Sequence, residues 1–189
     1  QIALHAIAEI RVFAPESWII FGGVMYNNVL SVPMLAEVND PKVAYTFHSY
    51  EPLIFTHQGA YWVDGMPSDF RIAYPNTIEN YRESSKMLSQ ELAGAIFEGD
   101  LPEVGPAFFE ALFQPALKIA EERDIPLYCG EYGVIDQADT ESTLHWYRTI
   151  TSVFDKYHIG RAAWTYKGMD FGLTDSHMNP ILPQVLPLL

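Results

Sequence analysis

The stretch Ile125-Pro126-Leu127-Tyr128-Cys129-Gly130-Glu131-Tyr132-Gly133 places one carboxylate, Glu131, at the downstream end of a short apolar segment, between two glycines. A short apolar run bounded by glycine and proline is typical of a buried strand in a parallel sheet. In enzymes built from parallel strands, the residues that act on a substrate lie at the carboxyl ends of those strands. The pattern therefore indicates Glu131 as a candidate for chemistry.

Two other predicted strands also end on side chains that can bind or react. The strand Val43–Phe47 runs into His48 and Tyr50, and the strand Arg161–Trp164 ends on an indole. Parallel strands end at the same edge of a sheet, so we expect these side chains to lie near Glu131. If the first strand continues past Phe47, His48 and Tyr50 lie two residues apart and project from the same face.

Helical patterns separate the predicted strands. In Glu141–Tyr157, large apolar side chains recur at helical spacing, and either Asp139 or Thr140 is a suitable N-cap. The segment Phe108–Arg123 has a similar stripe, but Pro115 is expected to kink the helix or restart it. This alternation predicts an α/β fold in which helical crossovers join parallel strands.

Three further segments complete the predicted organisation. Residues 1–10 have a helical pattern, and Trp18–Val24 is a fourth apolar strand. Glu51–Thr77 has no sustained period and is rich in proline, glycine and aromatic residues, including Tyr61 and Trp62. A loop of this length in a compact domain is usually functional, and this one is expected to form a wall beside the strand ends.

The order and spacing of four motifs resemble glycoside hydrolase family 5, the cellulase family of retaining glycosidases with eight-stranded barrels. The motifs are Phe47-His48-Ser49-Tyr50-Glu51-Pro52, Phe55-Thr56-His57-Gln58-Gly59-Ala60, Cys129-Gly130-Glu131-Tyr132-Gly133 and Trp164-Thr165-Tyr166-Lys167-Gly168-Met169-Asp170-Phe171-Gly172. The family also has an Asn-Glu(-Pro) acid/base after its fourth strand, and the sequence has none there.

The resemblance therefore implies the second half of a (β/α)8 TIM barrel. Residues 1–189 would form a single, partial catalytic domain of about four strands with crossover helices. A complete barrel needs about 250 residues, so this chain is too short to close one alone. The expected partner is a complementary N-terminal half-barrel or a second copy of the chain.

The resemblance also assigns roles at the strand ends. It implies an enzyme that cleaves β-1,4-glucan with retention, with Glu131 as the nucleophile. It gives His48 a contact to a sugar hydroxyl, and it lets Tyr50 donate a hydrogen bond to the nucleophile. Trp164 would form the floor under one sugar ring, with a cis peptide bond to Thr165. The alternatives are a carboxylate held for structural reasons and aromatic residues that only fill the barrel.

Candidates in the loops are weaker, because aromatic residues and lysines are common on protein surfaces. Trp62, Tyr26, Asn28 and Lys167 follow predicted strands and are candidates for contacts to neighbouring sugars. His57 is expected to stabilise its loop through hydrogen bonds. Neither zinc nor calcium ligand spacing is present in the sequence, and the implied reaction requires no metal or other cofactor.

The source of the acid/base is open within the sequence. Asn39-Asp40-Pro41 looks superficially similar to the family motif, but it precedes the strand Val43–Phe47 and so lies at the opposite edge of the sheet. Glu51 is the best internal substitute, because it follows Tyr50 on the expected side. Without a general acid, the isolated chain is expected to hydrolyse glucan poorly or not at all.

Composition limits the possible partners. The 189 residues are 49% hydrophobic, enough for one core, and carry a formal net charge of −13. This charge disfavours nucleic acids and anionic membranes, while a neutral polysaccharide is compatible with it. No apolar run approaches the roughly 20 residues of a membrane span. The single cysteine, Cys129, is expected to be a packed core thiol, and family resemblance implies a secreted protein, although the sequence has no signal peptide.

Two other classes of function remain as alternatives. The first is a catalytically incomplete half-barrel that binds carbohydrate or self-associates through its open sheet edges without hydrolysis. The second is a nucleotide-binding α/β fold, which also binds ligands at strand ends. The pair Gly22-Gly23 lacks the glycine spacing that surrounds a pyrophosphate, so this second alternative has little support.

Overall fold

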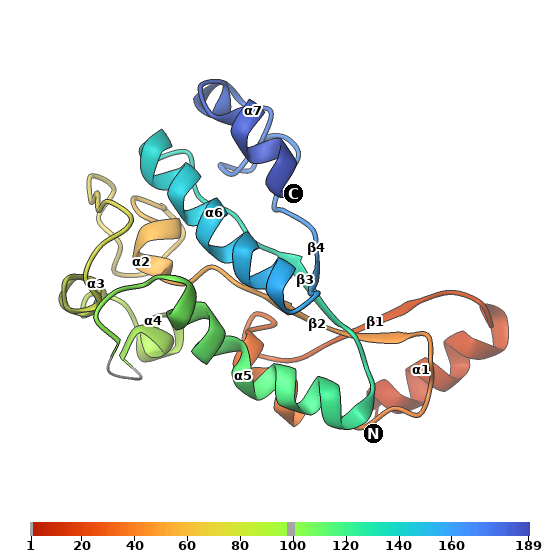
Figure 1. The fold of residues 1–189 in the computed structure, drawn as a ribbon. Coiled ribbons are helices and arrows are strands. Elements are labelled where there is room, and N and C mark those ends of the chain that lie inside the picture. Colours follow the sequence, from red (N-terminus) through yellow and green to blue (C-terminus); the bar gives the residue numbers. More distant parts are fainter. Residues whose placement is uncertain (1, 98–100) are drawn as a thin grey trace.

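The computed structural model describes residues 2–97 and 101–189, and these residues contain one four-stranded sheet (Figure 1). The strands are all parallel and follow the chain in the order β1-β2-β3-β4. Each neighbour in the sequence is therefore also the neighbour in the sheet, as in one part of a barrel. The strands are β1 (Ile19–Gly22), β2 (Val43–His48), β3 (Leu127–Glu131) and β4 (Gly160–Arg161).

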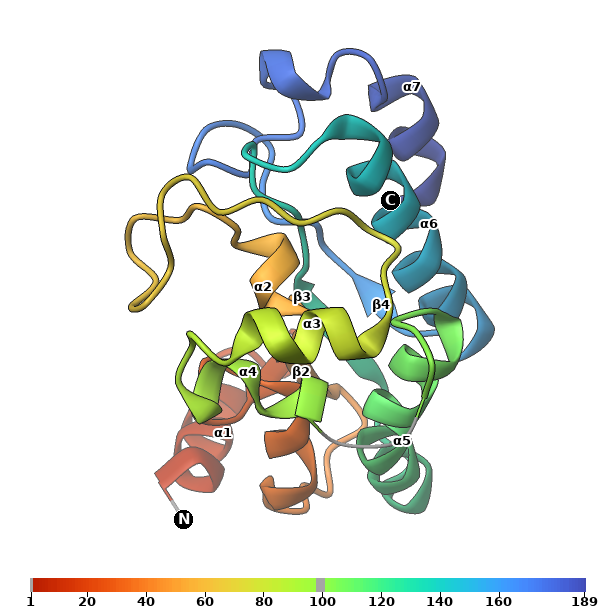
Figure 2. The ribbon, with the colours of Figure 1, turned by 90° about the vertical axis from the view of Figure 1, so that its left-hand side faces the viewer.

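Helices and short 3-10 turns connect the strands. In Figure 2, α5, α6 and α7 follow one another along one side of the molecule, and α3 and α4 lie together near α2. The α-helices are α1 (Ile2–Phe13), α2 (Leu53–Thr56), α3 (Ile78–Ser85), α4 (Gln90–Phe97), α5 (Pro106–Arg123), α6 (Thr140–Lys156) and α7 (Leu182–Val185); the 3-10 helices are η1 (Val29–Met34), η2 (Ser176–Met178) and η3 (Leu186–Leu188).

Helix α6 forms as its sequence predicts. The side chain of Asp139 accepts a hydrogen bond from the backbone N–H of Ser142, which makes Asp139 the N-cap. The apolar stripe includes Trp146 and Ile150, which are both fully buried. The helix ends one residue before Tyr157, which is the C-cap and only partly buried.

Helix α5 is continuous through Pro115, so of the two expected effects, a kink or a restart, the helix does not restart at this residue. Proline removes one backbone donor, but the residues around it lie in the core. Phe109, Phe113 and Ala116 are fully buried, and the Phe113 ring lies 5.3 Å from that of Phe47 on β2. Burial of this face stabilises the helix enough to offset the missing hydrogen bond.

The two faces of the sheet differ. On the face covered by α5 and α6, Phe47 and Cys129 are fully buried. On the opposite face, Thr46 and His48 lie beside Gly130, where an added Cβ would approach both side chains. This second face corresponds to the interior of a barrel, and it leads to the carboxyl ends of the strands.

The strand ends differ slightly from the prediction. Strand β2 ends at His48, so Tyr50 lies beyond it, and the register with β3 shifts between Phe47 and His48. The shift pairs His48 with Glu131. Strand β4 is shorter than predicted, but the backbone N–H of Trp164 still donates to the Tyr132 carbonyl at 2.9 Å. The segment after β4 therefore stays beside the end of β3 as far as Trp164.

Residues 2–25 present apolar side chains to solvent. Phe13 on α1 is 85% exposed, Trp18 is 58% exposed and Ile20 on β1 is 51% exposed. Strand β1 pairs only with β2 among the described strands. Apolar exposure on this scale is typical of an interaction surface. In residues 2–97 and 101–189, no helix is both long and apolar enough to cross a membrane.

Candidate active site

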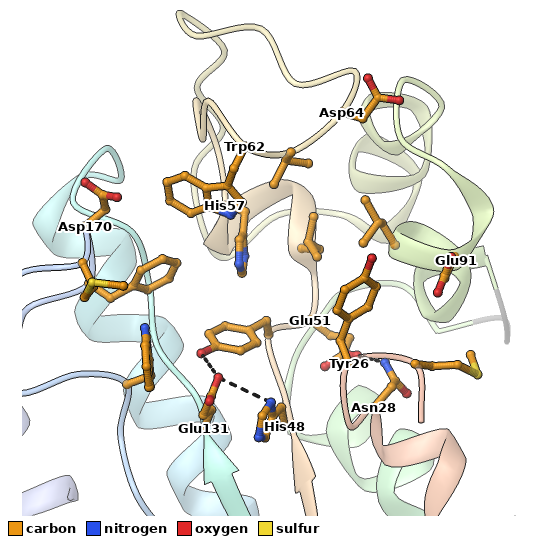
Figure 3. Close-up of a pocket in the computed structure, with 18 of the residues that line it drawn as sticks. Tyr26, Asn28, His48, Glu51, His57, Trp62, Asp64, Glu91, Glu131 and Asp170 are labelled. Carbon is orange, nitrogen blue, oxygen red and sulfur yellow. Dashed lines mark hydrogen bonds and ion pairs between the residues drawn. The ribbon is translucent and has the colours of Figure 1, made fainter. Parts of the chain in front are cut away.

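A cleft of about 770 Å³ opens at the carboxyl ends of the strands (Figure 3). Its walls come from the loops after β1 and β2, from α4 and from the segment after β4. The residues that line it are Met25, Tyr26, Asn28, His48, Tyr50, Glu51, Leu53, His57, Tyr61, Trp62, Val63, Asp64, Glu91, Leu92, Glu131, Trp164, Met169, Asp170 and Phe171.

Glu131 meets two side chains through a single carboxylate oxygen. The Tyr50 hydroxyl donates a hydrogen bond to Glu131 Oε2 at 3.0 Å, and His48 Nδ1 lies 3.4 Å from the same oxygen. Figure 3 shows the side chains of His48 and Glu131 meeting at the ends of β2 and β3. The side chains of His48 and Glu131 keep 27% and 28% of their exposure, so both are accessible from the cleft.

The two side chains that contact Glu131, His48 and Tyr50, are both uncharged at neutral pH. Burial lowers the pKa of His48, although the charge of Glu131 opposes the shift, so the imidazole is neutral at neutral pH. Burial raises the pKa of Tyr50 well above its usual range, and the charge of Glu131 acts in the same direction. Tyr50 therefore keeps its proton and remains a hydrogen-bond donor to Glu131.

Trp164 lies at the cleft with the cis peptide bond to Thr165 that was predicted. Its side chain is partly buried and packs against a small cluster formed by Ala60, Ile135 and Phe171. One face of the cleft is therefore aromatic.

Gly133 allows the close approach of the Trp164 backbone. An added Cβ at Gly133 would lie 2.3 Å from the Trp164 carbonyl oxygen, and this backbone atom cannot move without moving the indole. We expect Gly133→Ala to lower the free energy of unfolding by about 1–3 kcal/mol. Urea denaturation measures this loss, and Gly94→Ala, where an added Cβ meets nothing within 4 Å, is the control. Equal stability of Gly133→Ala and the wild type would contradict the predicted close contact.

His57 lies among aromatic rings rather than among charges. Its ring centroid is 4.9 Å from that of Tyr50 and 5.2 Å from that of Phe171. Burial lowers the pKa of His57 to about 4, so the ring is neutral near pH 7. The Thr56 hydroxyl donates to the Tyr50 carbonyl, so its contact with His57 Nδ1 at 3.0 Å requires that nitrogen to be the donor.

Gln58 connects two parts of the loop that follows β2, and sequence reasoning missed this role. Gln58 is buried and exchanges hydrogen bonds with the backbone of Ile72: its Oε1 accepts from Ile72 N, and its Nε2 donates to Ile72 O. The His57 ring contacts Thr56 as described above, and its backbone N–H and carbonyl bond to Leu53 and Ala60. Gln58 lies inside one of the four motifs, which could have indicated a role for it. Its partner Ile72 is 14 residues further along the chain, so local sequence does not predict the contact.

The structure places the loop candidates unequally. Trp62, Tyr26 and Asn28 line the cleft, and Tyr26 is 76% exposed. Lys167 is exposed and is not among the lining residues. Sequence reasoning also missed Glu91, which lines the cleft. This residue lies on α4 and not after a strand, so the search for side chains at strand ends did not find it.

The other polar candidates lie as follows. Asp40 forms an ion pair with Arg11 at 2.8 Å, immediately before β2 and away from the cleft. Glu51 lines the cleft but is buried and hydrogen-bonded to Ser49 and Asn28. Within the described residues there is no group of three or more His, Cys, Asp or Glu side chains that could hold a metal ion.

Cys129 is a packed core thiol, as predicted. It is fully buried, and its Sγ donates to the carbonyl oxygen of Glu131 at 3.2 Å. Burial raises the pKa of this thiol well above its usual value, so it is not a nucleophile at neutral pH.

Two known proteins have sequences similar to this chain. Endoglucanase C of Acetivibrio thermocellus is 30% identical over the whole chain, which covers 55% of that protein. Cellodextrinase A of Ruminococcus flavefaciens is 36% identical over 85% of the chain and 40% of its own length. The chain thus spans about half the length of the curated relatives it matches.

Solved structures share the fold. The cellulose synthase subunit Z of Clostridioides difficile superimposes with a TM-score of 0.74 at 20% identity, over 97% of this chain and 54% of that protein. The chain is therefore one half of a TIM barrel. A sequence model of the family described as "Cellulase (glycosyl hydrolase family 5)" matches residues 1–170. With Glu131, His48, Tyr50 and Trp164 gathered at one cleft, this match establishes that the chain belongs to glycosyl hydrolase family 5, the cellulase family.

Proposed function

We propose that this chain is the C-terminal half of a retaining glycoside hydrolase that cleaves β-1,4-glucan, with Glu131 as the nucleophile. The observation that carries the proposal is the shared contact of Tyr50 and His48 with one oxygen of Glu131 at the floor of the cleft. The names of the endoglucanase and cellodextrinase relatives support a glucan substrate. The family resemblance also supports a secreted protein.

Retention requires two displacements. In the first, a Glu131 oxygen attacks the anomeric carbon, the glycosidic bond breaks and the leaving oxygen takes a proton from a general acid. In the second, water attacks the same carbon, gives its proton to the conjugate base and releases Glu131. Tyr50 holds Oε2 before attack, so we assign the attack to Oε1. His48 is neutral and lies beside this carboxylate, where it can bind a sugar hydroxyl.

The general acid is proposed to come from outside this chain. The acid and the nucleophile of a retaining glycosidase must lie about 5–5.5 Å apart. Asp40 lies before β2 and pairs with Arg11, and the Glu51 carboxyl is occupied by Ser49 and Asn28. A complementary N-terminal half-barrel would provide the acid, and the apolar surface of α1 and β1 is the place where it would pack.

The anomeric form of the first product tests this reaction. When the chain is mixed with a complementary half-barrel and given cellotetraose, proton NMR in the first minutes is expected to show the β-anomer, because two displacements restore the original configuration. Appearance of the α-anomer first would indicate a single displacement, and Glu131 would then not be a nucleophile.

The charge of the cleft predicts a preference for neutral glycans. Asp64, Glu91, Asp170 and Glu131 line it, and no Lys or Arg is among the lining residues of the described chain. Anionic ligands therefore meet repulsion that salt screens. We expect this chain to bind carboxymethylated cellotetraose at least about 5-fold more weakly than cellotetraose at 20 mM salt, with a smaller difference at 500 mM. Calorimetry at the two salt concentrations measures it, and a difference that does not change with salt would contradict the electrostatic origin.

A further inference from the structure

A buried carboxyl stands beside the cleft without a part in the proposed reaction. Glu51 is 9% exposed and lines the cleft immediately after Tyr50. A buried carboxyl is costly unless it is hydrogen-bonded or neutral, so its surroundings reveal what it contributes. Its neighbours belong to three different parts of the chain.

The two carboxyl oxygens and the backbone carbonyl of Glu51 each accept a hydrogen bond from a different side chain. Asn28 Nδ2 donates to Oε1 at 3.1 Å, and Ser49 Oγ donates to Oε2 at 2.9 Å. The backbone carbonyl of Glu51 accepts from Trp146 Nε1 at 2.9 Å, and Trp146 is a fully buried residue of α6. Glu51 is thus fixed to the core through its backbone and reaches the loop after β1 through its side chain (Figure 3).

The loop after β1 needs such support. Met25, Tyr26 and Asn27 all have φ between 56° and 58°, a left-handed conformation that is unfavourable for non-glycine residues. This unfavourable run places Met25 and Tyr26 on the cleft. Surrounding contacts must hold the run in place.

Asn28 connects this run to the active site. Its Oδ1 accepts from the backbone N–H of Leu30, where η1 begins, and its backbone forms an isolated parallel bridge with His48. The N–H of His48 donates to the Asn27 carbonyl at 2.7 Å. If Asn28 is displaced, both the cleft wall formed by Met25 and Tyr26 and the backbone of His48 are therefore expected to move.

We propose that Glu51 is a positioning residue that fixes the loop of residues 25–28 against the end of β2 through Asn28. It preforms the Tyr26 wall of the cleft for a glucan chain. The identity of the ligand rests on the proposed function, whereas the effect on the loop does not. Glu51 makes no contact with Glu131 in this role.

Burial of Glu51 favours the neutral form of its carboxyl in the folded protein. Burial raises its pKa above 4.5, and the hydrogen bonds from Ser49 and Asn28 oppose the shift without reversing it. The titratable neighbour of Glu51 across the sheet is Cys129, which is a neutral thiol. Two ionisable residues lie close to Glu51 in the chain, His48 and Tyr50, and both are uncharged at neutral pH. The carbonyl oxygen of a neutral carboxyl accepts from Asn28 as an amide oxygen would, so glutamine should replace Glu51 in this contact.

The sign of the pH dependence follows from the raised pKa. The contribution of neutral Glu51 to stability is fully present below about pH 4.5, the pKa of an unperturbed glutamate. It is lost as the pH rises through the higher folded pKa, because the native state must then hold a buried charge. Glu51→Gln lacks this loss, so the melting temperature of the variant should rise relative to wild type between pH 4 and pH 8.

Amide hydrogen exchange of the free chain tests the loop directly. In Glu51→Leu and Asn28→Ala, the peptide of residues 22–30 is expected to exchange about 3-fold to 15-fold faster, as follows from loss of one hydrogen bond. Glu51→Gln should exchange at the wild-type rate. Ser49→Ala removes a different side-chain hydrogen bond to the same carboxyl without changing a residue of the loop, and it is the matched control.

Binding of cellotetraose at pH 5 gives the second readout. Calorimetry is expected to show a 3-fold to 15-fold weaker affinity for Glu51→Leu and Asn28→Ala, and an affinity within about 2-fold of wild type for Glu51→Gln.

Two results of the hydrogen-exchange experiment would overturn the proposal. One is exchange at the wild-type rate in residues 22–30 of Glu51→Leu, and the other is exchange in Ser49→Ala that is as fast as in Glu51→Leu. If Glu51→Leu does not fold, Asn28→Ala decides the same question. A wild-type chain that does not bind cellotetraose would count against the proposed function, and the exchange comparison would still decide the role of Glu51.

Discussion

Replacement of Glu131 by glutamine is expected to abolish glucan hydrolysis in the completed barrel. The amide keeps the size of the side chain and can still accept the hydrogen bond from Tyr50, which lies 3.0 Å from Oε2. It cannot form the glycosyl ester through which retention proceeds. We expect kcat to fall by at least about 10³-fold, because removal of a nucleophile typically costs this much or more.

The assay for this prediction is reducing-sugar release from cellotetraose by the chain mixed with a complementary half-barrel. Asp64→Asn and Glu91→Gln are matched controls, because each removes one carboxylate from the cleft wall and neither carboxylate has a role in the proposed reaction. Both should keep kcat within a few-fold of wild type, about 2-fold to 3-fold for a distant charge. A Glu131→Gln variant with near wild-type kcat would exclude Glu131 as the nucleophile.

Addition of an N-terminal half-barrel is expected to raise the rate of hydrolysis by about 10²-fold to 10⁴-fold over the chain alone. This range is what a general acid typically contributes, and the departing sugar oxygen needs a proton. The part of Endoglucanase C that this chain does not match is a suitable partner, because this chain covers 55% of that relative. Hydrolysis by the separate and mixed halves at equal concentrations measures the gain.

The control for complementation is the same half-barrel with its Asn-Glu acid/base changed to Asn-Gln, which should associate but not restore activity. A second copy of the present chain is not expected to restore hydrolysis, because it would duplicate Glu131 and Trp164 without adding an acid. Full activity of the isolated chain would contradict the proposed external acid. Glucan binding without hydrolysis in every mixture would instead favour the carbohydrate-binding alternative.

Much of the fold could be predicted from local patterns. Helix α6 begins after Asp139 and buries Trp146 and Ile150, as the spacing of apolar residues indicated. The continuous helix through Pro115 could not be predicted, because the intrinsic cost of proline is local but the compensating burial of Phe109 and Phe113 comes from packing with distant segments.

The candidate site also has features that local sequence predicts and features that it does not. Glu131, His48 and Trp164 each end or follow a strand, and parallel strands bring their ends together without further information. The register shift that pairs His48 with Glu131 has no local signal. Nor does the hydrogen bond between Asn28 and Glu51, which are 23 residues apart.

The sequence by itself determined the α/β class, the parallel order of the strands and the group of residues at their carboxyl ends, because periodicity and strand polarity act over a few residues. Only the tertiary structure decided that Gln58 secures the long loop, that Glu91 reaches the cleft from α4, and that Lys167 stays outside it. These outcomes depend on which loops pack against each other, and such contacts are chosen by the free energy of the whole fold rather than by neighbours in the chain.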